Sequence, residues 1–128
     1  MKYYISKTFK KEFDETVQLI TNALKEEGFG VLSEIDIQGK LKEKLGVEFR
    51  RYEILGACNP AYAYKALQQE DKIGTMLPCN VIVQELNDDT VEVAAVDPKA
   101  SMIAVENKHL VKIAEEIREK LGKAVSSL

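Results

Sequence analysis

The chain has 128 residues, of which 45% are hydrophobic and 30% charged, a balance typical of a folded domain and not of a disordered segment. Its formal net charge of −3 leaves no basic surface for nucleic acid or anionic lipid, so we expect neither nucleic acid nor a membrane as a partner. The two longest uncharged runs, residues 54–64 and 73–84, are far shorter than the ~20 residues of a membrane-spanning helix.

The first residues of the chain, MKYYISKTFKKEF, lack the apolar core and the small-residue cleavage site of a secretory signal. We therefore expect a cytoplasmic protein whose two cysteines are reduced thiols. Because there are no repeats, low-complexity tracts or linker-like stretches, residues 1–128 are expected to form a single domain.

In the first half of the chain, apolar residues at alternate positions predict strands, and apolar residues at helical spacing predict helices. Strands are expected over residues 3–9, 29–37 and 48–57, with helices over 12–27 and 37–45 between them. Gly28 supplies the left-handed residue that ends many helices, and Gly46 closes the second helix.

A third helix is predicted to begin at Asn59-Pro60 and to run to about Asp71. Asparagine can cap the free amides of a helix, and proline at the first helical position loses no hydrogen bond. This pair is therefore a strong helix start.

The last part of the chain predicts a hairpin and a long helix. Strands over 76–86 and 90–96 are joined by Asn87-Asp88-Asp89, a turn composition typical of antiparallel hairpins. Asp97-Pro98 ends the second strand, and Asn107 is expected to cap a helix whose apolar stripe extends from 110 to 121.

The predicted order is therefore β-α-β-α-β-α-β-β-α, which favours an α+β fold with a mainly antiparallel sheet and helices on one face. A doubly wound parallel sheet is the alternative, and the hairpin argues against it. Some strands carry apolar side chains in both registers, such as Tyr52 and Ile54 against Phe49 and Leu55. The second sheet face is then expected to meet a partner, which favours a homodimer or a ligand groove.

Each uncharged run contains a cysteine followed by asparagine, Cys58-Asn59 in the first and Cys79-Asn80 in the second. The plain interpretation is buried packing, because cysteine is among the most buried residue types. The alternative is thiol chemistry, since Cys58 lies just before a predicted helix N-terminus, which favours a thiolate. The 21-residue separation excludes a CxxC redox motif.

Metal binding and catalysis receive little support from the residues present. With two cysteines and one histidine, a metal site at Cys58 and Cys79 needs water, a carboxylate or a second subunit as further ligands. Glu106 and His109 could hold an adventitious divalent cation. No catalytic triad, phosphate loop or resident cofactor is predicted.

A third interpretation is an uncharged pocket for a small ligand, in which the helix amides after Asn59 are available to an anion. The side chains expected to line this pocket come from both cysteine segments and from the helix between them: Cys58, Asn59, Tyr62, Tyr64, Cys79 and Asn80.

The segments GACNPAYAYKAL and IGTMLPCNVIV, with a final helix after Asp97-Pro98, closely resemble the domain of unknown function 302 family. The resemblance implies a TATA-box-binding-protein-like α+β fold, with a curved antiparallel sheet and helices on one side, often assembling as a dimer. It implies no activity. The residues that match the family signature are Cys58, Asn59, Pro60, Leu77, Pro78, Cys79 and Asn80.

These observations together predict a homodimeric binding or interaction module with an uncharged site near Cys58 and Cys79. The alternative is a thiol-based redox protein, a metal-binding protein or an enzyme that uses the same two cysteines.

Overall fold

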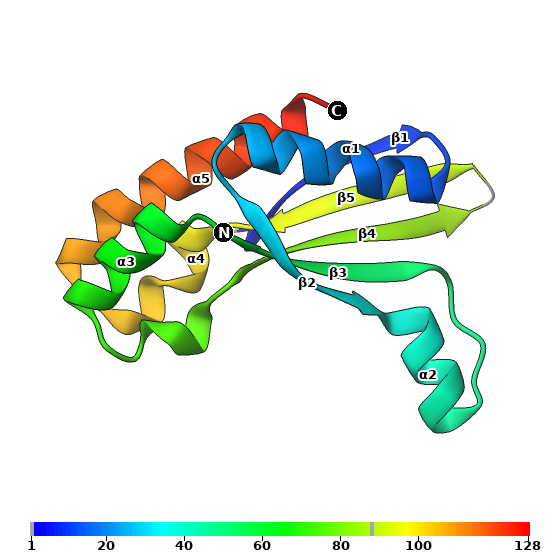
Figure 1. The fold of residues 1–128 in the computed structure, drawn as a ribbon, viewed down its shortest axis with the longest axis horizontal. Coiled ribbons are helices and arrows are strands. Elements are labelled where there is room, and N and C mark those ends of the chain that lie inside the picture. Colours follow the sequence, from blue (N-terminus) through cyan, green and yellow to red (C-terminus); the bar gives the residue numbers. More distant parts are fainter. Residues whose placement is uncertain (1, 88) are drawn as a thin grey trace.

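The fold is built on one five-stranded sheet, and the computed structural model describes residues 2–87 and 89–128. The strands lie in the order β1-β5-β4-β3-β2, and each neighbouring pair is antiparallel (Figure 1). Their bounds are Tyr4–Lys10 for β1, Gly30–Asp36 for β2, Tyr52–Cys58 for β3, Cys79–Asn87 for β4 and Thr90–Val96 for β5. The predicted α+β class is confirmed, and the doubly wound alternative is wrong.

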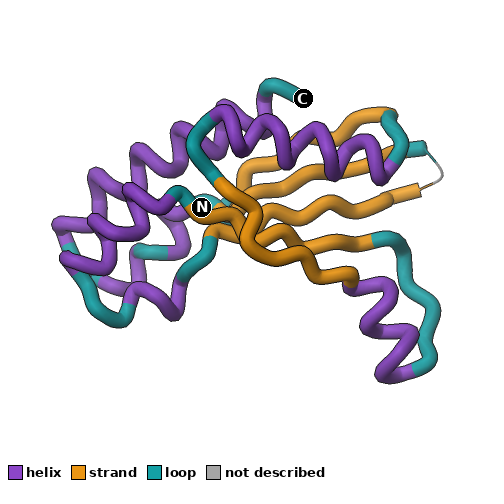
Figure 2. Tube along the Cα trace, viewed as in Figure 1, coloured by secondary structure: helices purple, strands orange, loops and turns teal. Residues whose placement is uncertain are grey.

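The long helices gather on one face of this sheet (Figures 1 and 2). Helices α1 (Phe13–Glu26) and α5 (Val111–Ser126) lie across the strands, and α3 (Pro60–Gln69) packs beside α5 at one end. Helix α2 (Ile37–Leu45) stands apart from this layer, at the far end of β2. Within the described residues, no helix has the length and apolar character to cross a bilayer.

Short helical turns connect these elements. They are η1 (Ile73–Met76) before β4, then α4 (Pro98–Ser101), η2 (Ile103–Val105) and η3 (Lys108–Leu110) before α5. The sequence pattern did not predict α4, whose first turn is set by Asp97: its carboxylate accepts from the Lys99 amide at 3.0 Å. Asn107 acts as the expected cap, because its Oδ1 accepts from the His109 amide at 2.9 Å.

The core lies between the sheet and the helices. Alternate side chains of β4 and β5, among them Val81, Val83 and Val93, are fully buried against Ile20 of α1 and Leu121 of α5. Because strand side chains alternate between faces, the residues between them point to the face without helices.

Two strands begin later than predicted. Strand β3 begins at Tyr52 instead of 48, because the preceding segment returns from α2 and the Gln38 side chain donates to the Phe49 carbonyl at 3.0 Å. Strand β4 begins at Cys79 instead of 76, since η1 occupies residues 73–76. The β4–β5 hairpin is confirmed by the pairing of Asn87 with Thr90. Asp88 of its turn lies outside the described residues.

Candidate functional site

The two Cys-Asn segments meet at a tightly packed corner. Cys79 opens β4 directly opposite Ala57 of β3, and Cys58 follows at the end of β3. The space enclosed there measures only about 20 Å³, enough for roughly one water molecule. Its walls come from β3, β4, α3, α5 and the segments that connect elements: Phe29, Ala57, Cys58, Asn59, Tyr62, Ala63, Ala66, Leu77, Pro78, Cys79, Met102 and Ile117.

The thiol of Cys79 is poorly suited to ionise. Its side chain is 6% exposed, and burial raises its pKa to about 11, with a smaller contribution from the neighbouring Cys58. The two cysteines therefore share one neighbourhood. Cys58 is half-buried. This arrangement is that of packed side chains.

Asn59 does not cap α3 with its side chain, which corrects the sequence-based expectation. No side-chain cap bond is formed there, and the Asn59 Nδ2 instead donates to the Glu27 carbonyl at 3.3 Å, beyond the end of α1. The backbone of Gly28, with φ of 89°, lies so close to the Asn59 side chain that a Cβ on residue 28 would be 3.0 Å from Asn59 Nδ2. The asparagine joins the end of α1 to the start of α3.

Gly56 supplies a second close approach at this corner. A Cβ on Gly56 would lie 2.9 Å from Cγ of Pro78 and closer still to the Ser33 hydroxyl. The two signature segments thus touch each other through Gly56 and Pro78.

The predicted pocket residues do not all converge. Tyr62 lines the small cavity, but Tyr64 is 65% exposed on the outer side of α3. Asn80 is the neighbour of Cys79 and points to the other face of the sheet, because consecutive strand side chains alternate. The structure therefore brings four of the six side chains together and leaves Tyr64 and Asn80 outside that group.

A larger concavity lies on the sheet face that the helices leave uncovered, and we call it the open-face hollow. It measures about 400 Å³, twenty times the space at the cysteines. It is lined by three tyrosines and by side chains and backbone of β3, β4 and β5: Tyr3, Tyr4, Tyr52, Asn80, Ile82, Gln84, Glu92, Ala94, Ala95 and Val96.

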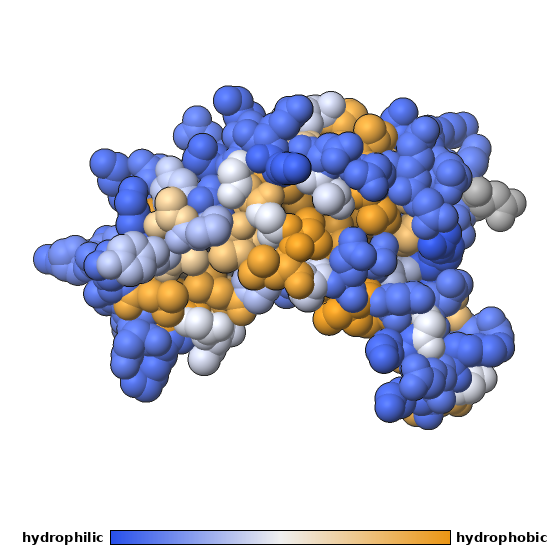
Figure 3. Space-filling model, viewed as in Figure 1, coloured by the Kyte–Doolittle hydropathy of each residue, from blue (hydrophilic) through white to orange (hydrophobic). Residues whose placement is uncertain are grey.

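The lining of the open-face hollow includes Ile82 and Ala94, which belong to an apolar row that runs across the sheet. The strand registers place Ile82 between Ile54 on β3 and Ala94 on β5, and extend the row to Ile35 on the edge strand β2. Ile35 is 42% exposed. Hydrophobic side chains are visible on the surface below the helical layer in Figure 3. Apolar surface of this kind normally meets a ligand or a protein.

A chain of polar contacts crosses the sheet at one end of the hollow. Arg50 Nε donates to Gln84 Oε1 at 2.8 Å, and Gln84 Nε2 donates to Glu92 Oε1 at 2.8 Å. The Arg50 guanidinium also lies over the rings of Phe49 and Tyr52, with centroid distances of 4.4 and 5.6 Å. These contacts fix the amide of Gln84 and the ring of Tyr52 in place.

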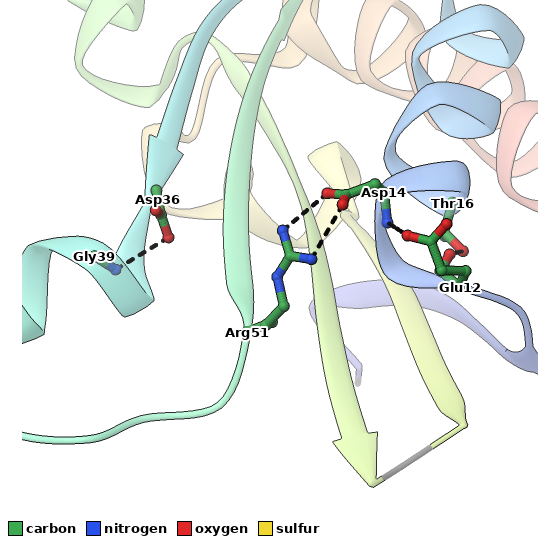
Figure 4. Close-up of polar contacts among 6 residues, drawn as sticks. All are labelled: Glu12, Asp14, Thr16, Asp36, Gly39 and Arg51. Carbon is green, nitrogen blue, oxygen red and sulfur yellow. Dashed lines mark hydrogen bonds and ion pairs between the residues drawn. The ribbon is translucent and has the colours of Figure 1, made fainter.

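On the opposite face, near α1, lies a second group of charged residues, of which Figure 4 shows the contacts between Arg51 and Asp14. Arg51 binds Asp14 of α1 through two contacts of 2.8 and 3.3 Å, and this hydrogen bonding holds the pKa of Asp14 below its usual value. Burial raises the pKa of Glu53, and the nearby Glu34 and Asp36 raise it further. This group lies outside the hollow.

The metal ligands considered from the sequence are the two cysteines, Glu106 and His109. In residues 2–87 and 89–128, no three His, Cys, Asp or Glu side chains converge on a point that could hold a metal ion. Glu106 adopts a left-handed backbone with φ of 56°, and His109 is exposed in η3. Neither they nor the cysteines complete a ligand set in one chain.

A family model matches residues 5–128, nearly the whole chain. The protein belongs to the family described as domain of unknown function DUF302. The resemblance seen in the Cys-Asn segments is thereby confirmed. Among solved structures, the chain is similar to the uncharacterized conserved protein DUF302 from Bacillus stearothermophilus, with 28% sequence identity and a TM-score of 0.91 over 98% of both chains. No curated protein matches the sequence.

Six of the seven signature residues therefore lie at the packed corner, whereas Asn80 lies in the open-face hollow, whose other lining residues are outside the signature. Sequence reasoning missed Tyr3, Tyr4, Gln84 and Glu92, because each is unremarkable in its own segment. The one signal in the sequence is that β3 carries apolar side chains on both of its faces. This pattern indicates that the second sheet face meets a partner, but it does not identify the residues that the other strands contribute to the hollow.

Proposed function

We propose that this DUF302 protein is a binding module whose binding surface is the open face of the sheet. The observation that carries the proposal is the hollow of about 400 Å³, lined by tyrosines and by apolar side chains of the strands, on the sheet face that carries no helical layer. Ligand sites are typically concave, mostly apolar and provided with a few well-placed polar groups.

The cysteine corner is the weaker candidate. A space of about 20 Å³ admits no metabolite, and the anion-binding role expected for the start of α3 needs room that is absent there. The high pKa of Cys79 also disfavours a thiolate at neutral pH. We therefore assign the two cysteines to packing and the binding role to the opposite face.

The lining of the hollow favours a small, neutral, planar ligand. Tyrosine rings and aliphatic side chains suit a flat apolar body, while the amides of Asn80 and Gln84 offer both donors and acceptors. Glu92 is the charged side chain in the lining, and its carboxylate repels an anion. A neutral heterocycle with hydrogen-bonding edges matches this combination.

The test uses indole, adenine and nicotinamide as defined probes, and measures thermal unfolding and calorimetric binding. Ile82→Lys places a charge in the lining of the hollow, and Leu67→Lys on α3 is the matched control at a side chain that is 45% exposed. We expect at least one probe to stabilise the wild type and the control and to lose binding to Ile82→Lys. At 100 times its Kd, such a probe would add about 2.7 kcal/mol.

Two results would contradict the proposal. One is that no probe stabilises the wild type, and the other is that Ile82→Lys binds the same probe as tightly as the control does. Far-UV circular dichroism of both variants establishes that the substitutions leave the fold intact.

A further inference from the structure

Two concavities adjoin along α5, where α4 packs against that helix (Figure 1). The first, which we call the α4–α5 groove, is lined by apolar side chains: Met102, Ile103, Leu110, Val111 and Ala114. The second, which we call the Arg118 pocket, is lined by charged side chains: Lys2, Asp97, Lys99 and Arg118. We propose that the two together bind an aliphatic chain with an anionic head group, a medium-chain carboxylate or phosphate monoester.

Shared residues join the two concavities. Lys99 belongs to both linings. Val111 and Ala114 of the groove and Arg118 of the pocket follow one another at positions i, i+3 and i+7, which places them on one face of α5. From Val111 to Arg118 this face extends about 10.5 Å along the helix, the span of an aliphatic chain of about eight to ten carbons. One molecule can therefore occupy both.

The α4–α5 groove suits an aliphatic tail. It measures about 440 Å³. Met102 and Leu110 are buried at 6% and 2% exposure, while Ile103 and Val111 stand at 66% and 52%. An apolar concavity with this much exposed side-chain surface is typical of a ligand site. Its apolar lining is aliphatic apart from the flexible thioether of Met102, which fits an alkyl chain better than a planar ring.

Asp97 holds the cations of the Arg118 pocket in place. Its side chain is buried at 6% exposure, and both carboxylate oxygens are engaged. Oδ1 accepts from the Lys99 amide at 3.0 Å, and Oδ2 accepts from Arg118 Nε at 2.9 Å. A guanidinium has five N–H donors, and within the described residues only Nε of Arg118 donates to a protein acceptor. The terminal nitrogens of Arg118 are thus available to a carboxylate or phosphate.

The charge of the Arg118 pocket favours an anion locally. Three cations line it against the one carboxylate of Asp97, which is already paired with Arg118. In the described part of the chain, neither Lys2 nor Lys99 has a carboxylate oxygen within 4.0 Å of its ammonium group. Lys2 Nζ lies 5.8 Å from the ring centroid of Tyr4, another residue of the pocket. An anionic head group therefore meets uncompensated positive charge there.

The groove has no comparable excess of charge. Besides Lys99, its charged lining residues are Lys108 and Glu106, which have opposite signs. This difference orients the ligand, with its head group in the Arg118 pocket and its tail in the groove. The site is separate from the open-face hollow, although Tyr4 belongs to the linings of both the hollow and the pocket.

The first test is calorimetric binding of octanoate and octyl phosphate to the full chain, below their micelle concentrations. Octanol and octylammonium carry the same tail with a neutral or cationic head, and should bind at least ~10-fold more weakly. The tighter of the two anions identifies the head group. From hexanoate to octanoate, each methylene should tighten binding roughly two- to fourfold. No binding of either anion, or equal binding of octanol or octylammonium, would overturn the inference.

The second test locates the head group and the tail. Lys99→Glu should weaken octanoate binding by more than ~10-fold, whereas Lys112→Glu, the same charge change at an exposed position of α5 outside both linings, should leave it unchanged. Ile103→Asp should remove the dependence on tail length. Equal affinities of the two charge variants, or an unchanged tail dependence in Ile103→Asp, would refute the site.

The variant Ile82→Lys separates this inference from the proposed function, because Ile82 lines only the open-face hollow of the two sites. It should bind octanoate as the wild type does, and loss of octanoate binding would place the anion on the open face and overturn the inference. Failure of every planar probe would leave octanoate binding unaffected. Failure of the anions would leave the planar probes unaffected.

Discussion

Replacing Gly56 by alanine should destabilise the protein, because this glycine allows the two signature segments to touch. A Cβ there would lie 2.9 Å from the Pro78 ring and in conflict with the Ser33 hydroxyl. The serine can rotate its hydroxyl, but the proline ring is rigid, so β3 or β4 must shift. Gly30 is the matched control, since it also lies in a paired strand and its Cβ would meet no atom within 4 Å.

The magnitude follows from two opposing effects. Overpacking typically costs about 1–3 kcal/mol, and glycine-to-alanine changes recover about 0.4–1 kcal/mol through the unfolded chain. The second effect is common to both variants, so the difference between Gly56→Ala and Gly30→Ala isolates the steric cost of about 1–3 kcal/mol. For a chain of this size each kcal/mol lowers Tm by roughly 3–5 °C.

Urea and thermal unfolding followed by circular dichroism measure this difference directly. Ser33→Ala combined with Gly56→Ala should recover part of the loss, because only the Pro78 contact then remains. If Gly56→Ala unfolds at the same urea concentration as Gly30→Ala, the corner is not tightly packed and the structural explanation of the signature is wrong.

The remaining predictions concern the same corner and the charged network near α1. At pH 7 the pKa of about 11 leaves a thiolate fraction on the order of 10⁻⁴ on Cys79. Iodoacetamide should therefore modify Cys79 far more slowly than Cys58 until urea unfolds the chain. Rapid labelling of Cys79 in the native protein would contradict its burial. Asn59→Asp should lower the unfolding free energy by about 1–2 kcal/mol, because it removes the donor to the Glu27 carbonyl. Unchanged stability would instead indicate that residue 59 acts as a helix cap, a position at which Asp and Asn are equivalent. Glu53 has a raised folded-state pKa, so its ionisation costs stability as pH rises. Glu53→Gln should therefore raise Tm at pH 7 and not at pH 3.5. An equal rise at both pH values would show that the ionisation of Glu53 is not the cause.

Much of the fold is predictable because its signals are local. The apolar spacing of residues 12–27, the Asn59-Pro60 start and the turn before Thr90 each specify an element without reference to the rest of the chain. The start of β3 was predicted four residues too early because Phe49 fits a strand pattern. Its backbone carbonyl instead accepts from Gln38, a contact that only the tertiary structure creates.

The site was less predictable, for a physical reason. Cys58 and Cys79 lie in the two longest uncharged segments of a charged chain, but such segments indicate burial as readily as binding. The open-face hollow combines Tyr4, Tyr52 and Glu92 from three strands, and strand order decides which of these residues meet. A periodic pattern predicts which side chains of a strand share a face, but it does not predict which strands lie next to one another in the sheet.

The most direct test of the account is a chemical-shift map of the amides during titration with the tightest-binding planar probe. If the open face is the binding surface, the shifts will cluster at Tyr52, Ile82, Gln84 and Ala94, and Cys58 and Cys79 will stay unchanged. Shifts centred on the two cysteines would contradict the central claim and restore the corner as the site.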